Sequence, residues 1–155
     1  MKRLLCMLVA AGALACNGEI AGLGPPSDPA TETFAASLGV DLTQMTRTAD
    51  GLYYRDVVVG TGDAVTTDTS VIVDYSGYLT DGTLFDSGNG IKFSTKAVVA
   101  GFREGILAGG GMKIGGIRQL VIPSELGYGP EGSPPTIPRQ ATLIFRIKLV
   151  SIPTS

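Results

Sequence analysis

The sequence contains no histidine and no tryptophan, and its only two cysteines are Cys6 and Cys16. Without histidine, imidazole acid–base catalysis, Cys/His nucleophilic pairs and the usual ligand sets of zinc sites are excluded. Gly109-Gly110-Gly111 follows the one helical segment instead of preceding it, so it indicates a helix end and a turn, not a phosphate loop. We therefore expect neither a metal nor a cofactor.

Charge is also scarce. The chain has 12 basic and 14 acidic side chains, a net charge of −2, and charged residues make up 17% of it. No basic face can form from so few cations, and a nucleic-acid partner has no support. Hydrophobic residues make up 44% of the 155 positions, which is typical of one globular domain.

One long hydrophobic run is present, Leu4–Ala15, and it follows Lys2 and Arg3. It is too short to span a bilayer but has the length of a signal-peptide core, so residues 1–15 are predicted to be a signal peptide. The following Cys16 gives Ala-Leu-Ala-Cys, which resembles a bacterial lipobox. The same residues also satisfy the small-x-small rule of ordinary signal peptidase. Two outcomes stay open: an envelope lipoprotein facing the periplasm or cell surface, anchored only at Cys16, and a secreted soluble protein.

Residues 16–50 are predicted to be a lipid-anchor cysteine, a flexible tether and an N-terminal arm. The tether, Asn17–Pro29, is rich in glycine and proline and has little to bury. In the arm, Thr31–Leu38 predicts two turns of helix, with Thr31 as cap and Phe34 on the same side as Leu38. We expect this arm to lie against the domain, in preference to binding a partner.

Residues 51–155 form the expected domain. Val71–Thr80 alternates apolar residues as a strand does and ends at Asp81-Gly82, a dipeptide typical of tight hairpins. One helix is predicted, Ala97–Leu107. The predicted fold class is α+β, a curved antiparallel β-sheet of about five strands wrapped around one short helix, with a ligand gap between them. The predicted strands are Leu52–Val59, Val71–Thr80, Leu84–Phe85, Ile91–Phe93, Ile117–Ile122 and Ala141–Ile152.

Three blocks carry a family resemblance. They are YSGYLTDGTLFDS at 75–87, GMKIGGIRQLVIPSELGYG at 111–129 and IPRQATLIF at 137–145. In this order and at compatible spacing they resemble the FKBP family, the macrolide-binding peptidyl-prolyl cis/trans isomerases. The resemblance implies the same wrapped-sheet fold and a pocket for a prolyl segment.

The resemblance also implies which residues form this pocket. Asp86 is expected to be buried against tyrosine hydroxyls. Phe102 stands where the family usually has tryptophan, but segment lengths around it differ, so Ile106 is the alternative for the pocket floor. The predicted catalytic residues are Tyr75, Phe85, Asp86, Phe102, Tyr128 and Phe145, and the predicted substrate-binding residues are Ile91, Val98, Val99 and Ile137.

Prolyl isomerisation needs no acid, base or nucleophile. Its barrier of about 18–20 kcal/mol comes from partial double-bond character, and the twisted state is favoured by a less polar surrounding. The resemblance therefore predicts an isomerase acting on proline-containing polypeptides, with tacrolimus or rapamycin as further ligands. We expect it to act as a monomer on exported proteins. The alternatives are a non-catalytic chaperone or adaptor that binds peptides in the same groove, and an inert lipoprotein that kept only the fold.

Overall fold

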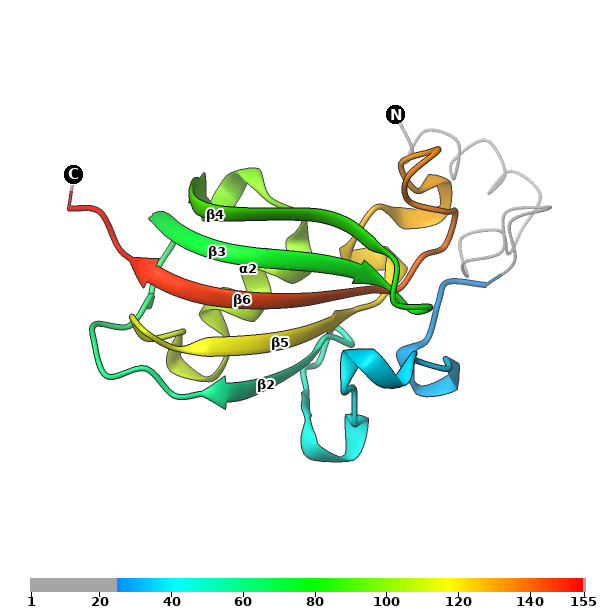
Figure 1. Ribbon diagram of the computed structural model, residues 1–155, viewed down its shortest axis with the longest axis horizontal. Helices are drawn as coiled ribbons and strands as arrows, with labels where there is room; N and C mark the ends of the chain where they lie inside the picture. The colour runs from blue at the N-terminus through cyan, green and yellow to red at the C-terminus, as the bar shows by residue number, and fades with distance from the viewer. Residues whose placement is uncertain (1–24, 155) are drawn as a thin grey trace.

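The computed structural model describes residues 25–154, which form one six-stranded antiparallel sheet with the order β1-β2-β5-β6-β3-β4. A single α-helix among these residues, α2, lies across one face of the sheet (Figure 1). The predicted α+β class is confirmed. The bounds are β1 (Thr46–Arg47), β2 (Tyr53–Val58), β3 (Ser70–Leu79), β4 (Leu84–Ser94), α2 (Ala100–Leu107), β5 (Ile117–Ile122) and β6 (Leu143–Ser151).

The turn between β3 and β4 forms at Asp81-Gly82, as predicted. Gly82 has φ +90°, which a glycine adopts without strain. The Leu79 N–H donates to the Thr83 carbonyl at 2.9 Å, and the Gly82 N–H donates to the Leu79 carbonyl at 3.0 Å. This hairpin fixes the register in which Gly77 pairs with Asp86.

The two short strands predicted within 84–93 are one continuous strand, β4. Between them, β4 has a bulge at Asn89-Gly90, because these two residues separate Gly88 from Ile91, whereas only Asp74 separates their partners on β3. The Asp74 carboxylate accepts a hydrogen bond from the Gly90 N–H at 2.7 Å, and Gly90 has φ +64°. A polar Gly-Asn-Gly run suggested a loop, but these residues are part of β4.

The core lies between α2 and the sheet. Gly101 and Gly105 let the helix approach closely, since a Cβ on either would lie 2.4 Å from a side-chain atom of Ile122 or Leu120. The helix begins at Ala100, later than predicted, and Thr95–Ala97 is a separate 3-10 turn. The buried apolar side chains of the core are Leu52, Val65, Val71, Val73, Phe102, Ile106, Met112, Leu120, Ile122, Ile137, Leu143, Phe145, Ile147 and Leu149.

Arg118 anchors the end of α2. Its side chain is 2% exposed, and its guanidinium donates to the Gly105 and Ala108 carbonyls, both at 2.8 Å. The same group pairs with both oxygens of Asp56, at 2.7 and 3.0 Å, and stacks over Tyr54. The last carbonyls of a helix lack intrahelical donors, so a buried cation there satisfies them and fixes the helix position.

The N-terminal arm contains short 3-10 turns and not the predicted two-turn helix. Thr31 is not a helix cap, because Asp28 precedes the first turn and accepts from the Ala30 N–H at 3.0 Å. Gly39, with φ +60°, ends the second turn. The turns are Pro29–Thr31, Ala36–Leu38 and Leu42–Gln44.

The arm is bound to the domain through backbone and small polar groups. Ser27 and Ser124 exchange two hydrogen bonds, at 2.8 and 3.1 Å, and Pro29 is buried. The Gln119 side chain donates to the Leu38 carbonyl at 2.8 Å. Ser27 and Pro29, which were predicted to belong to the flexible tether, are therefore held against the domain. The predicted signal peptide and Cys16 lie outside the described residues.

The arm lies on the face of the sheet opposite α2. Along β5, Arg118 and Leu120 point toward the helix, so Gln119 and Val121 point away from it. Val121 and its partner Ile144 are nevertheless 0% and 1% exposed. Because the arm is held against this face at Gln119, it covers them. β1, which was not predicted, is the last part of this arm.

Candidate functional site

A cavity of about 310 Å³ opens between α2 and the sheet. Strands β3, β4 and β6 supply one side of it, and the segment that leads into α2 supplies the other. It is lined by Tyr75, Asp86, Phe93, Ala97, Val98, Val99, Phe102, Tyr128 and Phe145. Seven of the ten predicted pocket residues are thus brought together.

Phe102 forms the floor of this cavity. It is 4% exposed, and its ring meets three other rings at steep angles, with centroids 6.2 Å from Tyr75, 5.9 Å from Phe93 and 5.2 Å from Phe145. Such edge-to-face contacts are favourable beyond the area they bury. Ile106, one turn further along α2, is fully buried in the core and does not line the cavity. Of the two residues predicted as alternatives for the pocket floor, the structure therefore has Phe102 in that place.

Asp86 is the charged group of the cavity. The Tyr75 hydroxyl donates to its Oδ2 at 2.9 Å. Asp86 was expected to be buried, but it is exposed, because β4 is the edge strand of the sheet. Burial, and then the hydrogen bond to Asp86, raise the pKa of Tyr75 to about 12. Tyr75 therefore keeps its proton at neutral pH and remains a donor.

Phe85 does not line the cavity. Its ring packs edge-on against Phe145, with centroids 5.5 Å apart at 89°. Gly77 lies under both rings, since a Cβ there would come within 2.7 Å of Phe85 and 2.8 Å of Phe145. This close approach explains the glycine of the Tyr-x-Gly motif. Phe85 supports the cavity from behind by holding Phe145.

Ile91 and Ile137 also lie outside the cavity lining. Ile137 is 4% exposed and belongs to the core, whereas Ile91 is 37% exposed on the edge strand. Phe93, which was not predicted, lines the cavity, and its ring lies tilted at 58° against Tyr75 with centroids 5.4 Å apart. An aromatic residue two positions along the same strand face was the signal available in the sequence.

Tyr128, Val98 and Val99 occupy the predicted positions. Tyr128 is 38% exposed, so its ring is only partly covered. The two valines belong to Ala97–Val99, which we call the wall segment; it runs from the last residue of the 3-10 turn after β4 to the residue before α2. Ala97 is the second lining residue that sequence reasoning missed.

A larger hollow of about 550 Å³ is lined by other residues of α2, including Arg103, Glu104 and Leu107. It contains one aromatic ring, Tyr54, and charges of both signs. Such a lining suits desolvation of an amide less well than the smaller aromatic cavity does. Within residues 25–154, no three His, Cys, Asp or Glu side chains group as metal ligands do, and no helix is long and apolar enough to cross a membrane.

Comparison with known proteins agrees with this geometry. The model of the FKBP-type peptidyl-prolyl cis-trans isomerase family matches residues 62–150. An FK506-binding protein of Neisseria meningitidis serogroup B is 40% identical over 108 residues, which cover 66% of this chain and 96% of that protein. A solved peptidyl-prolyl cis-trans isomerase from Pseudomonas syringae superposes with a TM-score of 0.67 at 29% identity, covering 77% of this chain and 87% of its own.

Other relatives are longer proteins. FK506-binding protein 4 of Dictyostelium discoideum is 44% identical over 105 residues, which are 65% of this chain but 28% of that protein. What such relatives share with this chain is the domain that contains the cavity. The match over residues 62–150, together with the near-complete alignment to the Neisseria protein, shows that the chain belongs to the FKBP-type peptidyl-prolyl cis-trans isomerase family.

Proposed function

We propose that this protein is a prolyl isomerase that rotates X-Pro bonds inside the aromatic cavity. The observation that carries the proposal is the ring cluster around Phe102, which provides a floor that is 4% exposed beneath an open mouth. A prolyl ring fits such an apolar floor. The relatives named as isomerases or FK506-binding proteins support the same activity.

The cavity residues can lower the rotation barrier without proton transfer. As the C–N bond twists, amide resonance is lost and charge withdraws from the carbonyl oxygen, so an environment of low polarity favours the twisted state over the planar one. Phe102, Phe145 and Phe93 provide that environment. The first N–H groups of α2 lack intrahelical acceptors, and at the wall segment they can donate to a peptide carbonyl.

Tyr75 and Asp86 have an orienting role in this proposal. Their hydrogen bond ties β3 to the edge strand β4 at the cavity mouth. The bond fixes the Tyr75 ring, which packs at a tilt against Phe93 and meets Phe102 edge-on. Loss of Asp86 would therefore loosen the ring without removing a reacting group.

We further propose that the enzyme works outside the cytoplasm on exported polypeptides. Support comes from the sequence: a basic start, the apolar run Leu4–Ala15, and Cys16 in a lipobox-like context. Slow X-Pro isomerisation limits the folding of exported proteins as it does others. Mass spectrometry of the mature N-terminus distinguishes an acylated Cys16 from the free N-terminus of a secreted protein.

The activity is tested with a short X-Pro peptide and the full chain, by following isomer exchange directly. We expect the rate to exceed the uncatalysed rate, with preference for a bulky apolar residue before proline. Tacrolimus (FK506) should compete with the peptide for the cavity, and Tyr128→Ala combined with Phe145→Ala should abolish tacrolimus binding. If the folded protein binds the peptide but does not accelerate its isomer exchange, it is a peptide-binding module and not an isomerase.

A further inference from the structure

The wall segment has few bonds of its own. Neither Ser94, before the 3-10 turn, nor Val99, before α2, makes a side-chain cap. The Val99 carbonyl accepts from the N–H groups of Phe102 and Arg103, at 3.0 and 3.2 Å, which are bonds of the helix start. Something outside Ala97–Val99 must therefore hold the wall segment at a fixed distance from the sheet.

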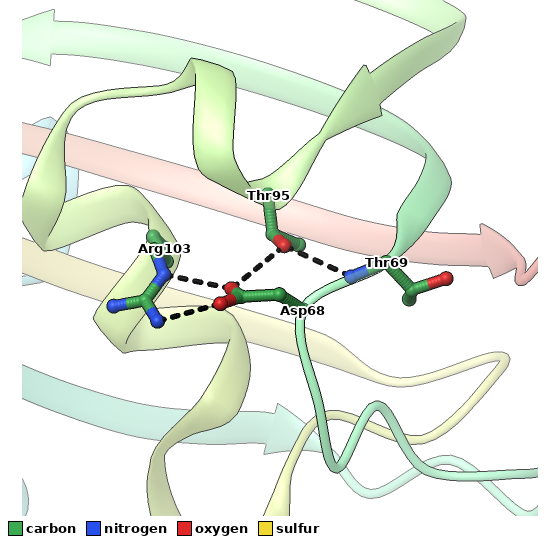
Figure 2. Close-up of polar contacts among 4 residues, drawn as sticks. All are labelled: Asp68, Thr69, Thr95 and Arg103. Atoms are coloured by element: carbon green, nitrogen blue, oxygen red, sulfur yellow. Dashed lines mark hydrogen bonds and ion pairs between the residues drawn. The ribbon is translucent and has the colours of Figure 1, made fainter.

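Asp68 is placed to do this. It lies in the loop before β3, and Figure 2 shows its carboxylate between Thr95 and Arg103. Oδ1 accepts from the Thr95 hydroxyl at 3.0 Å and from Arg103 Nε at 2.7 Å, while Oδ2 accepts from a terminal nitrogen of Arg103 at 2.8 Å. One side chain thus binds Thr95, which precedes the wall segment, and Arg103, which follows it on α2.

Thr95 makes this connection specific through hydrogen bonds of its own. Its hydroxyl donates to Asp68 and accepts from the Thr69 N–H at 3.1 Å, and its own N–H donates to the Thr69 carbonyl at 2.9 Å. Thr95 is fully buried, so the hydroxyl has a fixed orientation. Thr95 therefore docks the end of β4 onto the chain that enters β3 (Figure 2).

The carboxylate is charged at every pH used for assays. The hydrogen bond from Arg103 is the main reason that the pKa of Asp68 falls to about 2. The side chains of Arg103 and Asp68 are 45% and 22% exposed, so solvent screens their attraction and the pair adds little to global stability. Because Asp68 adds little stability but connects the wall segment and α2 to the loop before β3, its main effect is on the position of the wall segment.

We propose that Asp68 is a positioning residue of the isomerase: by holding Thr95 and Arg103 it keeps Val98, Val99 and Phe102 at the distance from the sheet that the twisted amide requires. The proposal rests on the proposed isomerase activity. It assigns a role in catalysis to a residue that does not line the cavity. A planar substrate can still bind against the sheet side, so loosening the wall segment affects the twisted state more than binding.

The test compares Asp68→Asn and Thr95→Val with wild type in the full chain. We expect each variant to lower kcat by about fivefold while KM changes by less than about twofold, because the lost contacts act in the transition state. Combining Asp68→Asn with Thr95→Val should cost little more than either alone, since both break the same connection. Thr95→Ser, which keeps the hydroxyl, should restore kcat to within about twofold of wild type.

The matched control is Asp41→Asn. Like Asp68, Asp41 accepts hydrogen bonds from a threonine, here from the N–H and hydroxyl of Thr43, but it is exposed and lies in the N-terminal arm. It should leave kcat and KM unchanged. A wild-type kcat in Asp68→Asn, a loss confined to KM, or an equal loss in Asp41→Asn would each overturn the proposal.

Methyl NMR of Val98 and Val99 separates this proposal from the proposed activity. In Asp68→Asn, their order parameters should fall while those of Val73, a core residue of β3, stay as in wild type. A wild-type protein without isomerase activity would refute the proposed function. The methyl data would still show whether Asp68 holds the wall segment in place. Unchanged order parameters of Val98 and Val99 in Asp68→Asn would refute the positioning role of Asp68 even if the enzyme is active.

Discussion

The two faces of the sheet are covered in different ways. Toward α2, interlocking apolar side chains such as Leu120 and Ile122 fill the space, and the cavity opens where the rings around Phe102 leave room. On the opposite face, the N-terminal arm covers Val121 and Ile144 and is held by bonds to backbone carbonyls and serine hydroxyls. The packing on the first face depends on which side chains are present. The covering of the second face depends mainly on the path of the backbone of the arm.

This difference implies that activity and stability can be changed separately. Substitutions among the cavity rings should alter catalysis, whereas changes to the arm should alter folding and leave the cavity chemistry intact. α2 contains both kinds of residue on one helix, because Phe102 lines the cavity and Ile106 does not. The predictions below test that separation.

The largest effect is expected for Phe102→Ala. Removing a buried phenylalanine costs about 3–5 kcal/mol of unfolding free energy. It also opens the floor to water, and we expect kcat/KM per folded molecule to fall by more than about tenfold. Urea unfolding and peptide isomerisation measure the two effects.

Ile106→Ala is the control for Phe102→Ala. It should cost about 2–5 kcal/mol of stability, because Ile106 is 0% exposed, but its kcat/KM per folded molecule should stay near wild type. Equal losses of activity in both variants would mean that the cavity responds to core packing in general, and activity and stability would then not be separable on this face of the sheet.

Removal of the arm should have the next largest effect. A chain that begins at Gly51 exposes Val121 and Ile144, and at about 1.5–3 kcal/mol for each side chain it should lose roughly 3 kcal/mol or more of unfolding free energy. A chain that begins at Pro25 keeps Ser27 and serves as the control. Activity per folded molecule should be the same in both. Equal stability of the two chains would show that the arm does not cover this face.

The contrast between the faces also explains what the sequence could predict. The cavity side depends on alternating apolar residues and on residues such as Tyr75 and Phe145, whose motif spacing is visible in the sequence. The arm binds through groups such as the Leu38 carbonyl, which every residue type has, so no residue pattern marks the contact. The choice of Phe93 over Ile91 depended on the sheet edge and the bulge, neither of which the alternation reveals.

A smaller effect is expected for Asp86→Leu. Because Asp86 is exposed and orients Tyr75 without transferring a proton, we expect a loss of about tenfold in kcat/KM, roughly 1.4 kcal/mol. Tyr75→Phe removes the same hydrogen bond and should give a similar loss, and the double variant should be little worse than either single variant. A loss of several orders of magnitude with the fold intact would point to proton transfer by Asp86.

The smallest effect expected is that of pH between 6 and 8. The chain has no histidine, and the pKa of Tyr75 is about 12, so neither imidazole nor this phenol titrates in that range. Measured kcat/KM should therefore stay level within about twofold. A bell-shaped profile near neutrality would contradict desolvation as the source of catalysis.

The stability of the fold should change at high pH because of Tyr75: unfolded Tyr75 releases its proton near its ordinary pKa of 10.0, while the folded residue keeps it until about 12. The unfolding free energy should thus decline above pH 10, and Tyr75→Phe should reduce that decline.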